Sequence, residues 1–298
     1  MRGGLSRATL GSHKPEPRKV HEMTRSIHLS TGVTLPYVEQ GDPSGVPMIL
    51  LHGYSDSSRS YELLLPHLPD SIHAYAYTQR GHADAAKPVA GYRVEDYVAD
   101  VAAFMDAMGI DAAVIVGHSG GSYTAQRFAL DHPDRTLGVV LIGSFRAFHD
   151  NPGVLELREA VAQLSDPVDA DFAREFQESC VAQPVPAAFI DAIVAGSRQM
   201  PARVWRDYLA GVLEADVPTE SGTIGAPTLI VWGDQDAFCP RSDQDALLAA
   251  IPRSRLSTYR GTGHCPHWEQ PERAAAEIAA FTRSVAEAAP HPEPAPVI

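Results

Sequence analysis

Short apolar runs that alternate with helical patterns constrain the fold of this chain more than any other feature. Residues 48–51, 112–116 and 228–232 carry no charge and have the length of buried strands. Residues 94–108 place apolar side chains at helical spacing, and residues 120–131 also predict a helix. Further strands are predicted at residues 26–29, 33–39, 73–77, 137–142 and 256–259, and further helices at residues 242–251 and 271–288. This alternation indicates an α/β fold with a mostly parallel central sheet and helices on both faces.

One long segment interrupts the alternation. Between Gly143 and Ile224 there is no strong strand pattern. Amphipathic patterns there predict helices at residues 152–165, 169–182, 186–199 and 202–215. A structureless loop of this length would be unusual in a compact domain, so we expect an inserted helical cap. The predicted division is a disordered leader at residues 1–24, a core at 25–144 and 223–289, a cap at 145–222 and a disordered tail at 290–298.

Charge and cysteine content limit the partners and the location. With 24 basic and 37 acidic residues, the net charge of −13 argues against nucleic acid as a partner. No apolar run is long enough to span a membrane, and no secretory signal is recognisable. The 3 cysteines form no disulfide framework and lack zinc-ligand spacing, which favours a reducing, cytoplasmic location. The predicted partner is a small-molecule substrate, and a homodimer is left open.

The strongest chemical signal is the sequence GHSGG at residues 117–121. It fits G-x-S-x-G, it follows an apolar run, and a predicted helix comes directly after it. In such a strand–turn–helix the serine hydroxyl is lifted above the sheet edge, and glycines avoid collisions with neighbouring backbone. A Gly-rich structural turn would also contain this motif, but the setting favours Ser119 as a nucleophile.

A serine hydroxyl needs a base to remove its proton, and the base is usually a histidine. The sequence has 13 histidines, so position must decide between them. His264 lies between the last predicted strand and the last predicted helix, in a loop expected at the same sheet edge as Ser119. His52 and His118 flank other motif residues and are expected to be structural. His264 is therefore the predicted general base.

The orienting acid should lie between the serine and the histidine in chain order. Asp234 and Asp236 both follow the predicted strand at residues 228–232. Asp236 lies further into the loop, where it could reach the imidazole, whereas an aspartate at the position of Asp234 often stabilises a turn. Asp236 is the favoured acid, with Asp234 as the alternative.

A tetrahedral intermediate also needs hydrogen-bond donors for its oxyanion. One is expected from the backbone amide of Gly120, which follows the predicted nucleophile. The second is expected from the loop after the strand at residues 48–51, where Tyr54 follows His52-Gly53.

Several pieces of the sequence together resemble the α/β-hydrolase superfamily. They are LLHGY at residues 50–54, QRGHADAAKP at 79–88, GHSGG at 117–121, GDQDAFCP at 233–240 and GTGHCPHWEQPE at 261–272. The resemblance implies an α/β-hydrolase fold, a catalytic triad of Ser119, Asp236 and His264, and oxyanion amides at Tyr54 and Gly120. The insert resembles the caps of epoxide hydrolases, haloalkane dehalogenases, cofactor-free haloperoxidases and carbon–carbon bond hydrolases. The first two groups use an aspartate nucleophile, so Ser119 argues against both.

The resulting prediction is a serine hydrolase that cleaves a carboxylic ester or lactone of a small to medium apolar substrate. Tyr123, Phe145, Trp205 and Trp268 are predicted to line its pocket, and no metal or organic cofactor is expected. One alternative keeps the triad but cleaves the carbon–carbon bond of a β-diketone-like substrate or forms peracids. A third possibility, from a different functional class, is a ligand receptor or signalling protein that retains the triad.

Overall fold

The computed structural model describes residues 24–288 and is built on an eight-stranded sheet. The strand order is β1-β2-β4-β3-β5-β6-β7-β8. β1 and β2 form an antiparallel pair, β2 is antiparallel to β4, and all remaining pairs are parallel. The strands are β1 (Arg25–His28), β2 (Thr34–Gln40), β3 (Val46–Leu51), β4 (Ile72–Tyr77), β5 (Ala113–His118), β6 (Thr136–Ile142), β7 (Thr228–Gly233) and β8 (Ser254–Tyr259). The expected mostly parallel sheet is confirmed.

Helices follow most strands, and local signals in the sequence explain where they start and stop. The amide of Arg93 donates to the Asp96 carboxylate at 2.9 Å before the first turn of α1, and Gly109 ends the same helix with a φ of 67°. The α-helices are α1 (Val94–Met108), α2 (Gly120–Asp131), α3 (Pro152–Ala162), α4 (Ala170–Ser179), α5 (Ala187–Ser197), α6 (Ala202–Glu214), α7 (Pro218–Ser221), α8 (Arg241–Ala250), α9 (Pro266–Glu269) and α10 (Pro271–Ala288). The 3₁₀ helices are η2 (Ser58–Tyr61), η3 (Leu65–His67) and η4 (Pro133–Arg135). The sequence analysis did not find α7, α9 or the 3₁₀ helices, because one turn is too short to show a period.

Successive residues of the central strands pack on opposite faces of the sheet. Ile49 and Ile115 belong to a core that contains residues of α1, α2 and α8. Leu50 and Val116, one position along, belong to a second core, which α10 covers with Phe281 among others. Side chains alternate between faces along a strand, so an uninterrupted apolar run is required when both faces are buried.

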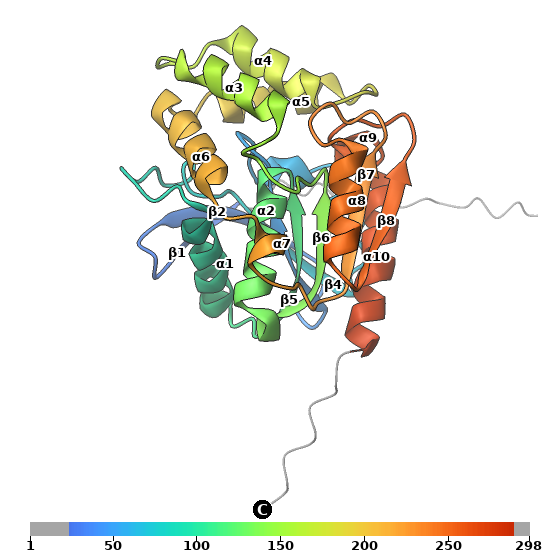
Figure 1. Cartoon of the computed structure of the whole chain (residues 1–298). Helices are drawn as coiled ribbons and strands as arrows, with labels where there is room; N and C mark the ends of the chain where they lie inside the picture. The colour runs from blue at the N-terminus through green and yellow to red at the C-terminus, as the bar shows by residue number, and fades with distance from the viewer. Residues whose placement is uncertain (1–23, 289–298) are drawn as a thin grey trace, which may run out of the picture.

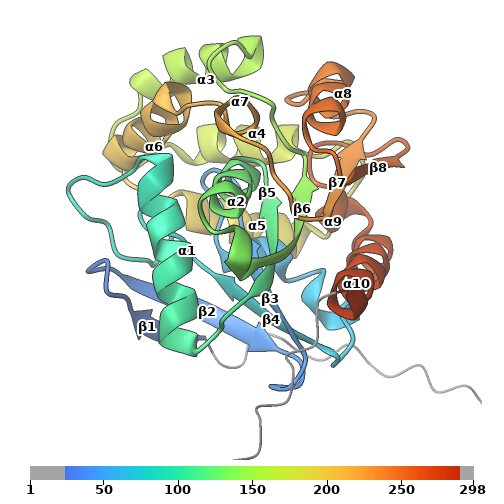
Figure 2. The ribbon, with the colours of Figure 1, turned by 60° about the horizontal axis from the view of Figure 1, so that its bottom comes forward.

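The α-helices α3 to α7 lie between β6 and β7 in the chain, and we call α3 to α6, with the segments that join them, the helical insert. In Figures 1 and 2 the arrowheads of β5 and β6 point toward this insert, so it lies over the carboxyl ends of the strands. Arg203 of α6 ties it to the core by donating to the backbone oxygens of Lys87 and Pro88, each at 2.9 Å. Ligands of parallel sheets bind at this edge, and the insert closes the space above it.

Between residues 24 and 288, no helix is long and apolar enough to cross a membrane. The predicted tail at 290–298 lies outside the described residues, as does the predicted leader at 1–24 except for its last residue.

Candidate active site

Ser119 occupies a strained turn between β5 and α2. Its backbone has φ 52° and ψ −121°, in a region that side-chain-bearing residues rarely adopt. Glycine on both sides makes the turn feasible. A Cβ at Gly117 would lie 2.3 Å from the oxygen of Gly121, and a Cβ at Gly121 would lie 2.3 Å from the oxygen of Leu51. The GHSGG sequence therefore has the strand–turn–helix setting that the motif requires.

His264 and Asp236 form a buried hydrogen-bonded pair. The Nδ1 atom of His264 lies 2.9 Å from Oδ2 of Asp236, and the two side chains are 3% and 0% exposed. The other carboxylate oxygen of Asp236 accepts the amides of Phe238 and Cys239 at 2.8 and 2.9 Å. Burial alone would raise the pKa of Asp236, but the charge and hydrogen bond of His264 and the two amides hold that pKa below its usual value. The carboxylate therefore stays ionised and orients the imidazole.

Asp234, the alternative acid, lies elsewhere in the same loop. Its Oδ1 accepts the amide of Gly261 at 2.6 Å, which ties the turn after β7 to the turn after β8. No hydrogen bond joins it to His264 among the described residues. The arrangement matches the turn-stabilising role expected from its position.

The insert and α9 position the backbone of the His264 loop. The amide of His264 donates to the oxygen of Cys180, just after α4, at 2.9 Å. The carboxylate of Glu269 in α9 accepts the amides of Gly263 and Gln183, both at 2.8 Å. Burial raises the pKa of Glu269. The loop that presents the imidazole is thus held by the insert as well as by the core.

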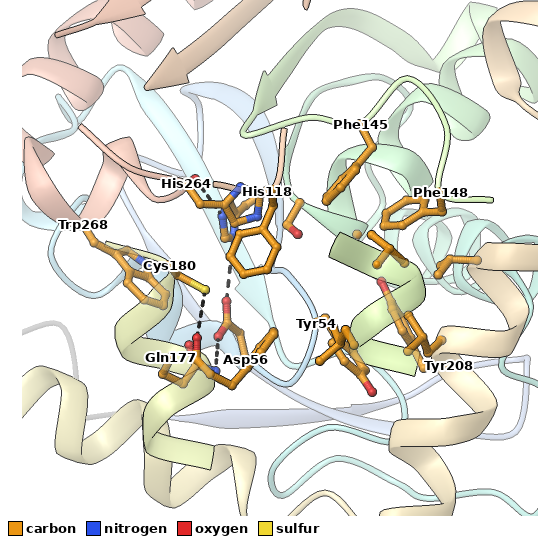
Figure 3. Close-up of a pocket in the computed structure, with 18 residues that line it drawn as sticks. Tyr54, Asp56, His118, Phe145, Phe148, Gln177, Cys180, Tyr208, His264 and Trp268 are labelled. Atoms are coloured by element: carbon orange, nitrogen blue, oxygen red, sulfur yellow. Dashed lines mark hydrogen bonds and ion pairs between the residues drawn. The ribbon is translucent and has the colours of Figure 1, made fainter. Parts of the chain in front are cut away.

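Ser119 and His264 line one pocket beneath the insert (Figure 3). The Nδ1 atom of His264 is engaged by Asp236, which leaves Nε2 for the pocket side. Among the described residues the Ser119 hydroxyl makes no hydrogen bond, to His264 or to any other group. Contacts of this kind are often long without substrate and tighten when it binds.

The two predicted oxyanion residues, Tyr54 and Gly120, line the same pocket. Gly120 is the first residue of α2, where helical amides have no partner within the helix. No described group accepts the amide of Tyr54. Both amides are therefore available to an oxygen of a ligand.

The remaining pocket wall is mainly aromatic and aliphatic. Phe145 and Trp268, two of the predicted lining residues, contribute to it. Other apolar lining residues include Phe148, Leu157, Phe176, Leu209, Val212 and Phe238. None of the described residues that line the pocket is an arginine or a lysine. Such a wall suits an uncharged, largely apolar ligand.

Two predicted lining residues do not reach the pocket. Trp205 is fully buried behind Tyr54, with ring centroids 4.9 Å apart, and its indole NH donates to the oxygen of Met200. Tyr123 packs its ring against Phe148, with centroids 5.0 Å apart, and its hydroxyl donates to the oxygen of Asp216. For these two residues the prediction is corrected, because their side chains pack against other residues and are not among those that line the pocket.

Sequence reasoning missed two polar lining residues, Asp56 and Gln177. Asp56 is 3% exposed, and Gln177 of α4 donates to its Oδ1 at 3.1 Å (Figure 3). The sequence held one signal for Asp56: it lies just after His52-Gly53, in the loop already expected to reach the site. For Gln177 no local signal exists, because only the folding of the insert over the sheet brings it to the pocket.

The other histidines near the site are buried and neutral. Burial lowers the pKa of His52, His118 and His267. His52 accepts the amide of Gln79 at 2.9 Å, and the rings of His118 and His267 lie 4.5 Å apart between centroids. These contacts fit the structural role expected for His52 and His118.

Asp236, Cys239 and His264 bring three atoms capable of binding a metal within 4.8 Å of one another. Each of these atoms is already engaged. The thiol of Cys239 donates to the oxygen of Gly143 at 3.3 Å, and burial raises its pKa. The three atoms lie close together because Asp236 bonds both His264 and the backbone of the loop that holds Cys239.

Comparison with known proteins supports the relationship suggested by this geometry. The model of the alpha/beta hydrolase family matches residues 48–277. The chain belongs to the alpha/beta hydrolase family. One curated relative of this α/β-hydrolase is the non-heme chloroperoxidase of Streptomyces lividans, 25% identical over 278 residues that cover 87% of this chain and 99% of the relative.

Solved structures show the same fold. A putative aryl esterase from Burkholderia cenocepacia superposes with a TM-score of 0.78 at 23% identity, over 89% of this chain and 100% of the esterase. A meta-cleavage product hydrolase from Pseudomonas fluorescens IP01 superposes with a TM-score of 0.74 at 22% identity, over 87% of this chain and 97% of the other. Membership of this family supports hydrolase activity for the chain.

Proposed function

We propose that this α/β-hydrolase is a serine hydrolase that cleaves a neutral carboxylic ester or lactone with small to medium apolar groups. The observation that carries the proposal is the shared pocket. Ser119 and the imidazole oriented by Asp236 line it together, and the described residues of its wall include no arginine or lysine. Asp56 is the only carboxylate among the described residues that line the pocket, and its charge disfavours an anionic substrate.

The proposed reaction proceeds through an acyl-enzyme. His264 takes the hydroxyl proton of Ser119 as its oxygen attacks the carbonyl carbon, and the amides of Tyr54 and Gly120 bind the resulting oxyanion. The bond to the leaving alcohol breaks, and His264 returns its proton to that alcohol. Water then attacks the acyl-serine, with His264 again taking a proton, and the acid is released. Asp236 holds the imidazole in the tautomer that this cycle needs.

The test compares wild type with Ser119→Ala on p-nitrophenyl acetate and on a panel of esters, lactones and β-diketones. We expect the variant to lose roughly 10⁴- to 10⁶-fold in kcat. A fluorophosphonate probe should label Ser119, as located by peptide mass spectrometry. Ser179→Ala, at a serine exposed on α4, is the control and should keep both activity and labelling.

Other results would overturn the proposal in defined ways. Activity that survives in Ser119→Ala excludes this serine as the nucleophile. Preferential cleavage of β-diketones replaces the ester bond by a carbon–carbon bond. A single slow turnover that leaves a persistent adduct favours a receptor that retains the triad.

Peracid formation is a second candidate, because the similarity to the chloroperoxidase spans nearly the whole length of that relative. In that reaction hydrogen peroxide replaces water as the group that attacks the acyl-serine. The test is bromination of phenol red in the presence of bromide, which the peracid oxidises to the brominating species; bromination that requires both acetate and peroxide, and that is lost in Ser119→Ala, would support this candidate.

The 3 cysteines are free and buried, which supports the further proposal of a reducing, cytoplasmic location.

A further inference from the structure

Gly120 leaves a space beside the Ser119 turn, and a side chain from the insert fills it. A Cβ atom at Gly120 would lie 2.0 Å from the hydroxyl oxygen of Tyr208. Since a carbon–carbon bond is about 1.5 Å long, that oxygen lies within about 3.5 Å of the Gly120 Cα. The residue that follows the proposed nucleophile is thus in direct contact with a tyrosine hydroxyl from α6.

The Tyr208 hydroxyl is directed into the pocket and has no protein partner. The residue is 3% exposed and lines the pocket, and Figure 3 shows its ring entering from α6. Among the described residues it makes no hydrogen bond. Tyr54, stacked on it, differs: its hydroxyl donates to the oxygen of Trp205 at 2.6 Å. A buried tyrosine hydroxyl usually has a partner, so a ligand is the expected one here.

The ring of Tyr208 is held on several sides. It stacks on Tyr54 with centroids 5.1 Å apart, and it meets Tyr97 and His82 edge to face at 5.2 and 5.4 Å. These three neighbours come from the core, not from the insert. A clamped ring aims its hydroxyl before substrate arrives, which is the condition under which a donor contributes most to catalysis.

We propose that Tyr208 is a third oxyanion donor, whose hydroxyl hydrogen-bonds the substrate carbonyl oxygen alongside the amides of Tyr54 and Gly120. This inference rests on the proposed function, because it assumes acyl transfer at Ser119. An oxygen bound by the Gly120 amide is also within reach of a hydroxyl in contact with Gly120. Glycine at position 120 is what makes room for this donor.

Protonation does not limit such a donor. Burial raises the pKa of Tyr208, and the nearby carboxylate of Asp56 adds to the shift. The hydroxyl therefore keeps its proton throughout the pH range in which a histidine base works.

The test is Tyr208→Phe, which removes one oxygen and keeps the ring. We expect kcat on p-nitrophenyl acetate to fall roughly 10- to 100-fold while KM changes little, because the hydrogen bond strengthens as the oxyanion forms. The inhibition constant of phenylboronic acid, which forms a tetrahedral adduct with serine, should rise by a similar factor. Thermal stability should be unchanged, since the hydroxyl has no protein partner to lose.

Tyr97→Phe is the matched control. Its ring also packs against Tyr208, but its hydroxyl donates to the oxygen of Arg80 at 3.4 Å, outside the pocket. It should keep the wild-type kcat and boronate affinity. Equal kcat for Tyr208→Phe and wild type, or a rise in KM alone, would overturn the inference and leave Tyr208 as a packing residue.

Failure of the proposed function would look different. In that case wild type itself would neither hydrolyse esters nor react with a fluorophosphonate, or Ser119→Ala would remain active. Either result would mean that no oxyanion forms by attack of Ser119, and the inference about Tyr208 would fail as well. If Ser119→Ala is inactive and Tyr208→Phe is not impaired, only the inference fails.

Discussion

Replacing Asp236 with asparagine tests how the imidazole of His264 is oriented. The asparagine oxygen can keep the amide hydrogen bonds of Phe238 and Cys239, because both amides reach the same Oδ1 atom, at 2.8 and 2.9 Å. The NH₂ group then takes the position of Oδ2 and faces Nδ1 of His264, now 2.9 Å from Oδ2. An amide NH₂ only donates, so Nδ1 must accept and the imidazole proton moves to Nε2. A histidine with that proton cannot take another from Ser119.

The expected loss follows from this tautomer change. With the geometry intact, kcat should fall roughly 10⁴-fold, which corresponds to about 5.4 kcal/mol of activation free energy. Folding should suffer far less, since two of the three hydrogen bonds of Asp236 persist and the net value of the third is about 1.5–3 kcal/mol. The assay is kcat on p-nitrophenyl acetate, with a circular-dichroism melt on the same sample.

Asp234→Asn provides the matched control, because Asp234 bonds Gly261 in the adjoining turn and does not touch His264. It should lose less than about tenfold in kcat, as expected for a change outside the reacting groups. The reasoning is refuted if Asp236→Asn stays within about tenfold of wild type, or if Asp234→Asn is the more damaging variant.

Three further predictions concern stability. Asp100→Ala leaves the Arg80 guanidinium buried without the carboxylate that it contacts twice at 2.6 Å, so urea unfolding should show a loss of about 3–5 kcal/mol; a loss under about 1 kcal/mol would contradict this. Gly121→Ala places a Cβ 2.3 Å from the oxygen of Leu51, and we expect little soluble protein; a wild-type melting temperature would show that the turn can relax. Because the pKa of Asp236 is held below its ordinary 3.8, the unfolded chain binds more protons near that pH. Its stabilising contribution is present above pH 3.8 and is lost as the pH falls through the folded pKa, so melting curves of Asp236→Asn should decline less in acid than those of wild type.

The strands and main helices could be predicted from the sequence because their signals are local. The run at residues 112–116 became β5, which extends to His118, and the helical spacing at 94–108 became α1 with the same limits. The choice of acid and base was also limited by position along the chain. Candidates had to follow a predicted strand, because the carboxyl ends of parallel strands meet at one edge of the sheet. In the structure Asp236 bonds His264 and Asp234 bonds Gly261.

The pocket wall could not be predicted in the same way. Phe145 and Trp268 line the pocket, whereas Trp205 and Tyr123, chosen on similar grounds, pack behind it. Tyr208 lies three residues from Trp205 on α6 and lines the pocket, although Trp205 was the residue chosen from that helix. Which of two aromatic residues on one helix faces a cavity depends on how that helix is rotated against the core.

The sequence by itself determined the alternation of strands and helices, the strained GHSGG turn and the set of acids and bases at the strand ends. These depend on side-chain periodicity and on steric contacts between residues close in the chain. Only the tertiary structure decided which side chains surround the Ser119 hydroxyl. Asp56 comes from the core and Gln177 and Tyr208 from the insert, and their approach to Ser119 depends on packing between segments at least 58 residues apart in the chain.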